Sequence, residues 1–268
     1  MAAAKGRSAT SSEADFLSHY DASLYERFSV AVDVVLLSAH ERRLHTLLVK
    51  RDEHPHKGRF ALPGGFVGGQ EDLASAAARV YKTKAGIADV FLEQLYTFGE
   101  TDRDPRLRVI SVAYYALIPH TQLVALAPDH QGTTVAALHV PWKGEEGGPV
   151  SASGEKGTAL SLAFDHASIL GLAIKRLRGK LSYTPVAFAL VGEAFTLFDL
   201  QRVHEAILGH ALNKDSFRRK ILAGDWVRPS GKLQAGVGHR PAELYTLHPQ
   251  ASRLRSGEGA RISGARSA

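Results

Sequence analysis

The stretch that decides the fold is FALPGGFVGGQEDLASAAARVYKTKAGI, residues 60–87. A glycine-rich loop comes first, and the residues after it place side chains three and four positions apart, the spacing of one helix face. Gly86 is suited to cap such a helix, because glycine adopts left-handed backbone at little cost. The stretch predicts a loop and then a helix from about Glu71 to Ala85. The positions that fit a helix packed on a core are Leu73, Ala76, Ala77, Val80 and Lys84.

The spacing of single residues in this stretch resembles the Nudix box, the signature of a family of pyrophosphate hydrolases. Gly65 is followed after five residues by Glu71, after seven more by Arg79, and seven positions later by Gly86. In the family motif the arginine is followed by three glutamates. The corresponding positions of this chain hold Val80, Thr83 and Lys84. The resemblance implies a Nudix α/β/α sandwich with a degenerate catalytic box.

The three replaced positions have a chemical consequence. Residues spaced i, i+3 and i+4 share one face of a helix, and in active members of the family the carboxylates on that face hold Mg²⁺, which requires hard oxygen ligands. Valine and threonine offer no carboxylate, and Lys84 brings an ammonium that pairs with a diphosphate. Glu71 alone rarely makes a metal site. We therefore expect no enzyme, no metal and no cofactor; the alternative is an ADP-ribose pyrophosphatase with residual activity.

Composition excludes several classes of protein. The 268 residues include no cysteine, which excludes disulfides and thiolate zinc sites. No apolar run approaches the ~18–20 residues of a membrane span, and the first residues lack a signal-peptide core, so we expect a cytoplasmic protein with no membrane partner. Of the net charge of +6, residues 165–248 carry twelve Lys/Arg against seven Asp/Glu. This basic excess suggests an anionic polymer as partner of the C-terminal part.

The patterning divides the chain into four parts: a disordered tail (1–24), a ligand-sensing domain (25–164), a DNA-binding part (165–248) and a basic disordered tail (249–268). The sensing domain contains a Gly-rich segment, 144–157, with the composition of a flexible insertion. Its predicted strands cover 28–37, 44–50, 90–99, 108–119, 136–142 and 160–164, with a turn at 39–43.

Helical periodicity begins at Asp165 and continues to Leu181, which predicts a helix connecting the two domains. Farther on, Thr196 and Asp199 form a capping-box variant that opens a helix ended by Gly209. Asn213 is an N-cap for a second helix through Leu222. Strand-like segments at 225–231 and 240–247 then flank a basic turn. This order predicts a winged helix-turn-helix.

Helix geometry selects the residues that read DNA. With Phe217 and Ile221 directed inward, Ser216 and Arg219 face outward, and we expect them at base edges in the major groove. Phosphate contacts are expected from flanking residues. The complete predicted DNA-binding set is Lys214, Ser216, Arg218, Arg219, Lys220, Lys232 and Arg240. A winged helix that contacts protein instead of DNA is the second interpretation, and a steep salt dependence of nucleic-acid affinity would argue against it.

A degenerate Nudix domain followed by a winged helix resembles the NrtR-type, Nudix-related transcriptional regulators. The resemblance covers residues 28–248 and implies a homodimeric repressor of NAD-metabolism genes that binds a palindromic operator. It also implies ADP-ribose or NAD as an effector that alters operator affinity. The matching stretches are 62–66, 95–99, 164–170, 195–201, 217–220 and 240–245.

Position relative to the box selects the effector-binding candidates. Basic residues are expected at the diphosphate, and Phe60 or Tyr96 at the adenine. The basic candidates are Arg51, Arg59, Lys84 and Arg108. We expect the connecting helix to transmit effector binding from this pocket to the DNA-binding domain.

Overall fold

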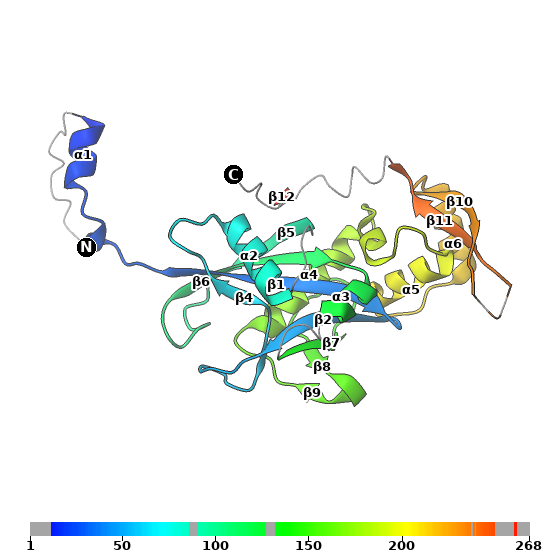
Figure 1. Cartoon of the computed structure of the whole chain (residues 1–268), viewed down its shortest axis with the longest axis horizontal. Coiled ribbons are helices and arrows are strands. Elements are labelled where there is room, and N and C mark those ends of the chain that lie inside the picture. The colour runs from blue at the N-terminus through cyan, green and yellow to red at the C-terminus, as the bar shows by residue number, and fades with distance from the viewer. Residues whose placement is uncertain are drawn as a thin grey trace.

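The computed structural model describes residues 12–85, 91–126, 132–236, 238, 240–249 and 260–261. Strand β1 (Ser29–His40) runs through the middle of the main sheet, parallel to β6 (Val109–Leu117) and antiparallel to β2 (Arg43–Lys50). The strands follow the order β12-β5-β6-β1-β2-β7-β8-β9, with β3 paired to β2 and β4 to β1 (Figure 1). The other strands of this sheet are β3 Phe60–Ala61, β4 Gly64–Phe66, β5 Phe91–Phe98, β7 Thr133–His139, β8 Ser151–Ser153, β9 Ala159–Leu160 and β12 Ala260–Arg261.

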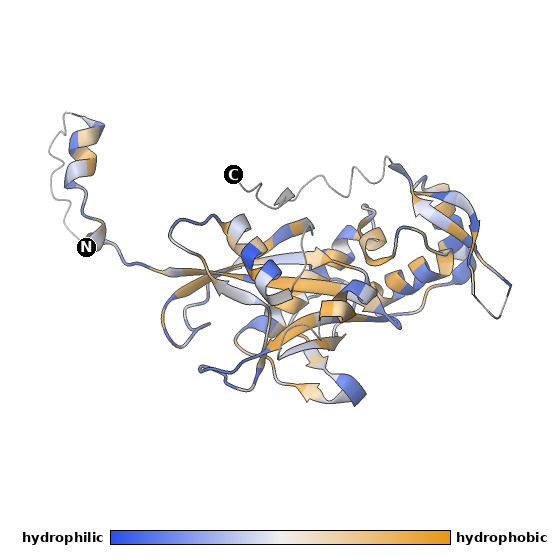
Figure 2. Cartoon of the chain, in the orientation of Figure 1, coloured by the Kyte–Doolittle hydropathy of each residue, from blue (hydrophilic) through white to orange (hydrophobic). Residues whose placement is uncertain are grey.

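Strand β1 is buried on both faces, because its side chains alternate between two helical layers. Val32, Val34 and Leu36 pack in a cluster with α2 (Leu73–Ala85) and α3 (His120–Leu126). Val35 and Leu37 belong to the cluster on the other face, with α4 (His166–Lys180). Hydrophobic residues accordingly line the central strands (Figure 2). The predicted α/β/α sandwich is confirmed.

The turn between β1 and β2 is tighter than predicted. The strands run to His40 and from Arg43, so that only Glu41 and Arg42 form the turn. Both have positive φ, 46° and 61°, which matches the twist of a two-residue hairpin. The hairpin therefore presents Arg42 at its tip.

The winged helix is also confirmed. Helices α5 (Leu197–Leu208) and α6 (Lys214–Ala223) precede a two-stranded sheet of β10 (Val227–Leu233) and β11 (Glu243–Leu247). Thr196 and Asp199 form the predicted capping box, and Gly209 ends α5 with left-handed backbone. Asn213 caps α6 as predicted. Strand β10 continues two residues beyond the predicted segment.

The two domains share one hydrophobic core. The cluster that contains Val35 of β1 continues through Ile174 of α4 and Leu200 of α5 to Phe217 of α6. The 3-10 helix η3 (Val186–Leu190) contributes Phe188, which meets Phe195 and Trp226 edge-on. The domain division at residue 165 stays a prediction.

Residues 144–157, which were predicted to be a flexible insertion, contribute a strand to the main sheet. Strand β8 pairs with both β7 and β9, and Val150 and Ala152 are buried. Gly171 of α4 lies so close to the backbone of Gly148 that a Cβ there would clash with its carbonyl oxygen. The glycines that suggested a linker in the sequence thus let this segment pack against α4. A 3-10 helix, η2 (Glu155–Gly157), follows β8.

Parts of both terminal segments have secondary structure, and the predicted disorder of the tails stays a prediction. Residues 13–24 form a helix, α1 (Glu13–His19), and a 3-10 turn, η1 (Ala22–Leu24), each with a side-chain cap. In the basic tail, Ala260–Arg261 pairs with β5. The remainder of both tails lies outside the described residues.

Candidate functional site

The degenerate box forms a rigid loop on α2. Glu71 makes two hydrogen bonds with Arg79, of 2.7 and 2.8 Å, and accepts a third from the backbone of Gly68. These bonds, from Arg79 first and Gly68 second, lower the pKa of Glu71 to about 2. Arg79 also donates to the carbonyl of Phe66. The carboxylate that remains in the box is therefore engaged in bracing the loop.

The positions of the missing glutamates face different surroundings. Val80 is buried in the core beneath Gly65, where a Cβ would come within 3.3 Å of a valine methyl. Thr83 donates to the carbonyl of Arg79 at 2.7 Å, within its own helix. The side chain of Lys84, and the predicted cap Gly86, lie outside the described residues. Within the described part of the chain, no three His, Cys, Asp or Glu side chains form a group suited to a metal ion.

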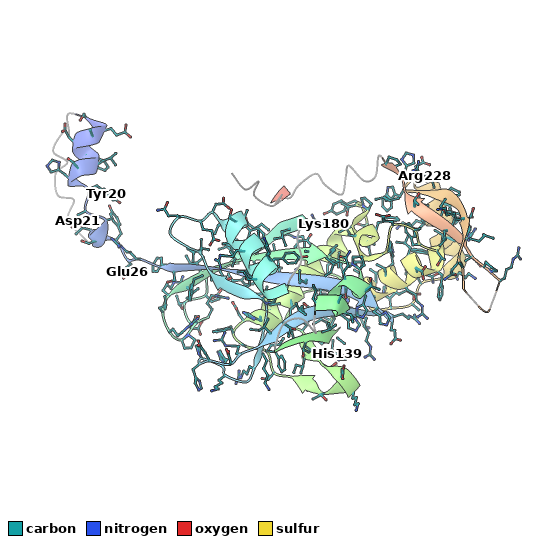
Figure 3. The ribbon with its side chains drawn as sticks, viewed as in Figure 1. Tyr20, Asp21, Glu26, His139, Lys180 and Arg228 are labelled. Carbon is teal, nitrogen blue, oxygen red and sulfur yellow. The ribbon has the colours of Figure 1, made fainter. Side chains whose placement is uncertain are left out.

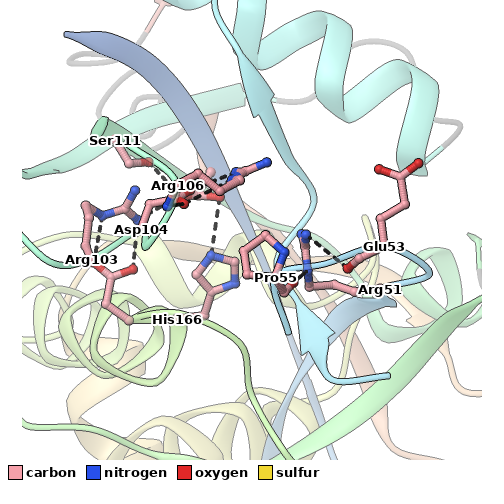
Figure 4. A network of polar contacts seen from close by, with 10 residues as sticks. Arg51, Glu53, Pro55, Arg103, Asp104, Arg106, Ser111 and His166 are labelled. Atoms are coloured by element: carbon pink, nitrogen blue, oxygen red, sulfur yellow. Dashed lines mark hydrogen bonds and ion pairs between the residues drawn. The ribbon is translucent and has the colours of Figure 1, made fainter. Parts of the chain in front are cut away.

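A buried polar network lies beside this loop, at one end of the sheet (Figure 4). Arg103 forms two hydrogen bonds with Asp165, at 2.9 and 2.7 Å, and reaches Asp33 at 3.5 Å. Ser111 donates to Asp33 at 2.5 Å. Burial opposes the charge of Arg103, but the nearby carboxylates outweigh it and raise its pKa. Gly64 makes room for this network, because a Cβ there would clash with the Asp33 carboxylate.

His166 completes the network in its neutral form. Its Nδ1 accepts a hydrogen bond from the backbone of Leu62 at 2.8 Å, so the proton is on Nε2, which lies 3.6 Å from Asp33. Burial lowers the pKa of His166 despite the neighbouring carboxylates. Beside the neutral histidine, the guanidinium of Arg103 lies between the carboxyl groups of Asp33 and Asp165.

The predicted effector residue Arg51 lies beside this network (Figure 4). It donates to the carbonyl of Pro55 at 2.7 Å, and its guanidinium stands 4.9 Å from the ring of Phe164. Phe164 in turn contacts His56 and His166. The structure therefore joins Arg51 to the network through an aromatic ring.

Arg59 and Phe60 border the same loop. The backbone of Arg51 donates to the carbonyl of Arg59, whose side chain is exposed. Phe60 is half-buried and packs against the core, so its ring is less available for stacking than predicted.

Arg108 and Tyr96 are the remaining predicted effector residues whose side chains the structure describes. Arg108 stands over Phe28, and its Nη1 atom is buried with no hydrogen-bond partner among the described residues. Tyr96 is 57% exposed on β5 and contacts Phe98. Across the part of the chain that the structure describes, no hydrogen bond, ion pair or ring contact joins Tyr96 to Arg51. Arg108 thus offers a free donor for an anion, whereas Tyr96 lies on an open strand surface.

The residues of the buried network were missed as site residues. One signal was available in the sequence: Asp33 is a lone carboxylate within an apolar, β-branched strand, where a charge needs a partner. Arg103 lies in a loop of mixed charges, and its pairing with Asp33 and Asp165, 70 and 62 positions away, depends on the fold.

The predicted DNA-binding residues lie on α6 and on the wing that follows it. Phe217 and Ile221 are buried, which confirms the predicted inner face of α6. Arg218 lies near the hydroxyl of Tyr245 in the wing. Arg228, which was not predicted, donates to Thr246 across the wing. The predicted residues Lys214, Ser216, Arg218, Arg219, Lys220, Lys232 and Arg240 are all exposed.

Arg178, in the last turn of α4, contacts the end of α5. Its Nε donates to the carbonyl of Ile207 at 2.7 Å, and its Nη1 donates to Gly144 at 2.8 Å. The guanidinium also lies 4.6 Å from the ring of Trp142. Burial lowers the pKa of Arg178, since its partners are carbonyls and an indole and none is a carboxylate.

A second contact joins the sheet to the turn of the helix-turn-helix. Glu205, buried in α5, accepts hydrogen bonds from Gln201 and from the backbone of Leu212. Arg42, at the tip of the β1–β2 hairpin, completes the contact at 3.0 Å. Burial acts to raise the pKa of Glu205, but these partners outweigh it and lower the pKa. We call the contacts of Arg178 and Glu205 the joint.

Family models of known proteins match both domains of this chain. A model of the NUDIX domain matches residues 27–143, and a model of the NrtR DNA-binding winged helix domain matches residues 187–247. The ADPR responsive transcriptional repressor NtrR of Acinetobacter baylyi is 35% identical over 237 residues, 88% of each chain.

Two further similarities cover different shares of the chain. The crystal structure of Shewanella oneidensis NrtR complexed with a 27mer DNA matches with a TM-score of 0.67 at 30% identity, over 86% of this chain and 99% of that one. The ADP-ribose pyrophosphatase of Methanocaldococcus jannaschii is 40% identical over 91 residues, which are 34% of this chain and 52% of that enzyme. The similarity to the regulators spans both domains, whereas the similarity to the hydrolase is partial.

Proposed function

The chain belongs to the family of NrtR-type, Nudix-related transcriptional regulators, and from this premise we propose that it is a DNA-binding repressor whose operator affinity changes when its Nudix domain binds ADP-ribose. One observation carries the proposal: a Nudix fold without carboxylates at positions 80, 83 and 84 is joined through a shared core to a winged helix with an exposed basic surface. A sensor needs binding without turnover, and this combination offers it.

The effector site of this proposal lies around the buried network. ADP-ribose carries a diphosphate, which Arg51, Arg59 and Arg108 are suited to bind. The unpartnered Nη1 of Arg108 supports its assignment, because a buried guanidinium donor without an acceptor is costly. Lys84 stays in the proposed set from its position in the box. Tyr96 and Phe60 remain the candidates for adenine stacking, of which the exposed Tyr96 is the more accessible.

We propose that α4 transmits the effector signal. Its N-cap, Asp165, is held by Arg103 in the network, and Arg178, at its other end, holds the end of α5. Strand β1 makes a second connection, from Asp33 in the network to the hairpin whose tip contacts Glu205. An effector shifts DNA affinity only through different affinities for two arrangements of the domains. Both connections end at α5, where a small rotation would move α6 relative to DNA.

The proposed DNA contact is that of a winged helix, with α6 in the major groove. Ser216 and Arg219 would meet base edges, and the other predicted basic residues would meet phosphates. Two copies of the chain would bind a palindromic operator near genes of NAD metabolism, in the cytoplasm. NAD is the second candidate effector.

Hydrolysis is not part of the proposed function. Metal-assisted attack on a pyrophosphate needs several carboxylates around the ion, and the box offers Glu71, which is engaged with Arg79. The partial similarity to a pyrophosphatase makes the assay of this activity the matched control.

The test is a fluorescence anisotropy titration of labelled promoter DNA from the host's NAD-synthesis genes, at fixed salt, with and without ADP-ribose or NAD. The same samples, with Mg²⁺, are assayed for AMP. Specific binding that one nucleotide alters, without AMP release, is the expected result. AMP release without specific DNA binding would show that the chain is a hydrolase. DNA binding that neither nucleotide changes would refute the sensor role.

A further inference from the structure

The segment from Ser12 to Phe28, which we call the arm, is exposed at every residue. It contains α1 and η1 and continues directly into β1. Figures 1 and 3 show it projecting beyond the body of the molecule, with Tyr20, Asp21 and Glu26 away from the sheet. An ordered segment with no buried residue needs an explanation.

The arm is unusually apolar for an exposed segment. Six of the fourteen exposed large hydrophobic residues in the described part of the chain lie within it. Given the ~150–250 Å² of a large aromatic side chain, their exposed portions amount to about 600 Å². A concentration of this size on a short segment is characteristic of an interaction surface. The six residues are Phe16, Leu17, Tyr20, Leu24, Tyr25 and Phe28.

The contacts of the arm aromatics beyond Phe28 are with one another. The rings of Phe16 and Tyr20 are 5.6 Å apart, and those of Tyr20 and Tyr25 are 5.9 Å apart. None of these three belongs to either hydrophobic cluster of the described residues. Helix α1 has seven residues, which is too few for stability in water without packing. A surface from outside the arm is therefore required.

The net charge of the arm limits the kinds of surface that can bind it. Residues 12–28 contain four carboxylates, Glu13, Asp15, Asp21 and Glu26, against one arginine, Arg27. Phosphate backbones and anionic lipid surfaces repel such a segment, since both attract basic residues. With −3 on the arm, the rest of a chain of net charge +6 carries +9. A second copy of the chain thus offers a body of the opposite charge.

A shallow groove of about 380 Å³, lined by polar and apolar atoms, lies at the root of the arm. Arg106 stands over the ring of Phe66, 5.4 Å from its centroid, and Arg108 stands over Phe28. Arg106 is paired with Asp104, so Arg108 supplies the positive charge that lies beside the hydrophobic side chains of the groove and complements the acidic aromatic arm. Its lining residues are Phe28, Ser29, Val30, Phe66, Val67 and Gly68.

We propose that the arm docks in this groove on a second copy of the chain, so that two copies exchange arms across a two-fold axis. Such an interface is reciprocal, and exchange of an element is a low-cost route to a dimer. Two arms of about 600 Å² each, with the surface that they cover, exceed the ~1,200 Å² lower limit of a stable interface. The inference deepens the homodimer of the proposed function and rests on it for the biological need of two DNA-binding domains.

The first test is the dimer dissociation constant of the full chain, measured by sedimentation equilibrium. We expect Leu17→Glu combined with Tyr20→Glu to raise it at least 100-fold, because both charges would be buried in the interface. Tyr183→Glu is the matched control, since Tyr183 is 67% exposed on the body. An unchanged constant in the arm variant, or a wild-type chain that is monomeric at micromolar concentration, would overturn the proposal. Circular dichroism checks that both variants are folded.

The second test identifies the surface that the arm covers. The chain has no cysteine, so introduced thiols form the only disulfides. A tagged chain with Leu17→Cys, Tyr20→Cys or Leu24→Cys is mixed with an untagged Phe66→Cys chain and mildly oxidised. An interchain product between the two supports the exchange. The proposal would be overturned if no interchain product formed at any of the three positions. It would also be overturned if a chain that carries both cysteines formed only an intrachain disulfide.

The two proposals fail in different ways. Calorimetry with ADP-ribose on the arm variant reports whether the effector site binds when the arm contact is removed. If wild-type chains exchange arms but bind neither promoter DNA nor ADP-ribose, the proposed function is wrong and the arm contact stands. If the chain binds both but does not dimerise through the arm, only the arm proposal is wrong.

Discussion

Two buried arginines hold the two ends of α4, and they do so by different means. Arg103 faces the carboxylates of Asp165 and Asp33, which raise its pKa. Arg178 faces the carbonyls of Ile207, Trp142 and Gly144, and burial lowers its pKa. The contacts of Arg103 compensate its charge with carboxyl groups, whereas Arg178 donates to a backbone carbonyl at the end of α5.

The difference indicates what each end can respond to. At the network end of α4, the stability depends on the balance between Arg103 and its two carboxyl partners. An anionic effector that moves the arginines there changes the free energy of these contacts directly. At the joint, no carboxylate compensates Arg178, and its bonds depend on the position of the α5 terminus. A charged ligand therefore acts at one end of α4, and geometry is transmitted at the other.

The largest expected effect is that of Arg103→Met. It leaves the buried Asp33 and the partly buried Asp165 without their cation, which costs roughly 3–5 kcal/mol of the free energy of unfolding. Urea denaturation measures this change. Arg103→Lys is the control and should restore part of the loss, because it keeps a positive charge. If Arg103→Met lowered the free energy of unfolding by less than Arg178→Met does, the contrast between the two ends of α4 would be wrong.

Arg178→Met should cost less, about 1.5–3 kcal/mol, because the carbonyls that it leaves are neutral and removing Arg178 relieves the burial of a charge. We expect operator affinity to fall as well, while ADP-ribose affinity measured by calorimetry stays within about twofold. Arg178→Lys should remain impaired, since one ammonium cannot reach the carbonyls as the planar guanidinium does. Equal losses of DNA and ADP-ribose affinity would show that the joint is not separate from the effector site.

Arg219→Ala separates the DNA-binding surface from the sensor. Loss of a base contact should weaken operator binding by roughly 1–3 kcal/mol, with ADP-ribose affinity unchanged. Lys232→Ala is the matched phosphate variant, which should reduce the salt slope by about 1 with little effect on sequence preference. Anisotropy titrations at several salt concentrations measure both. An equal loss on operator and unrelated DNA would mean that Arg219 contacts phosphate and reads no base.

The smallest effect concerns pH and the core between α5 and α6. Burial lowers the pKa of His204 to about 4, against about 6.5 in the unfolded chain. Between these values the unfolded state binds the extra proton, so this residue contributes stability that is lost as pH falls from about 6.5 toward 4. Its share at pH 5.5 is about 1 kcal/mol relative to neutral pH.

His204→Gln tests this contribution, because the amide can replace the hydrogen bond to Leu200 without titrating. Urea unfolding at pH 7 and 5.5 should show a smaller difference between the two pH values in the variant than in the wild type. His45→Gln is the parallel variant on the sheet, where burial also lowers the pKa to about 4. An unchanged difference in His204→Gln would show that His204 does not contribute to the acid sensitivity.

Local patterns decided much of this protein. The capping box at Thr196, the left-handed Gly209 and the cap at Asn213 each depend on residues within four positions, and the sequence predicted all three correctly. The inner face of α6 followed from helical spacing alone, with Phe217 and Ile221 buried. The same is true of α2 and of the resemblance to the Nudix box. Short-range geometry is nearly the same in any fold, so it can be predicted without knowing the fold.

Tertiary structure decided the network and the joint. Arg103 meets Asp165 across 62 positions, Ser111 meets Asp33 across 78, and Arg178 meets Ile207 across 29. Segment 144–157 had the composition of a linker, yet β8 joins the sheet because β7 offers an edge and α4 offers a glycine. Pairing partners distant in sequence have no spacing that reveals them; strand order and helix packing bring them together, and only the folded chain shows which charge meets which.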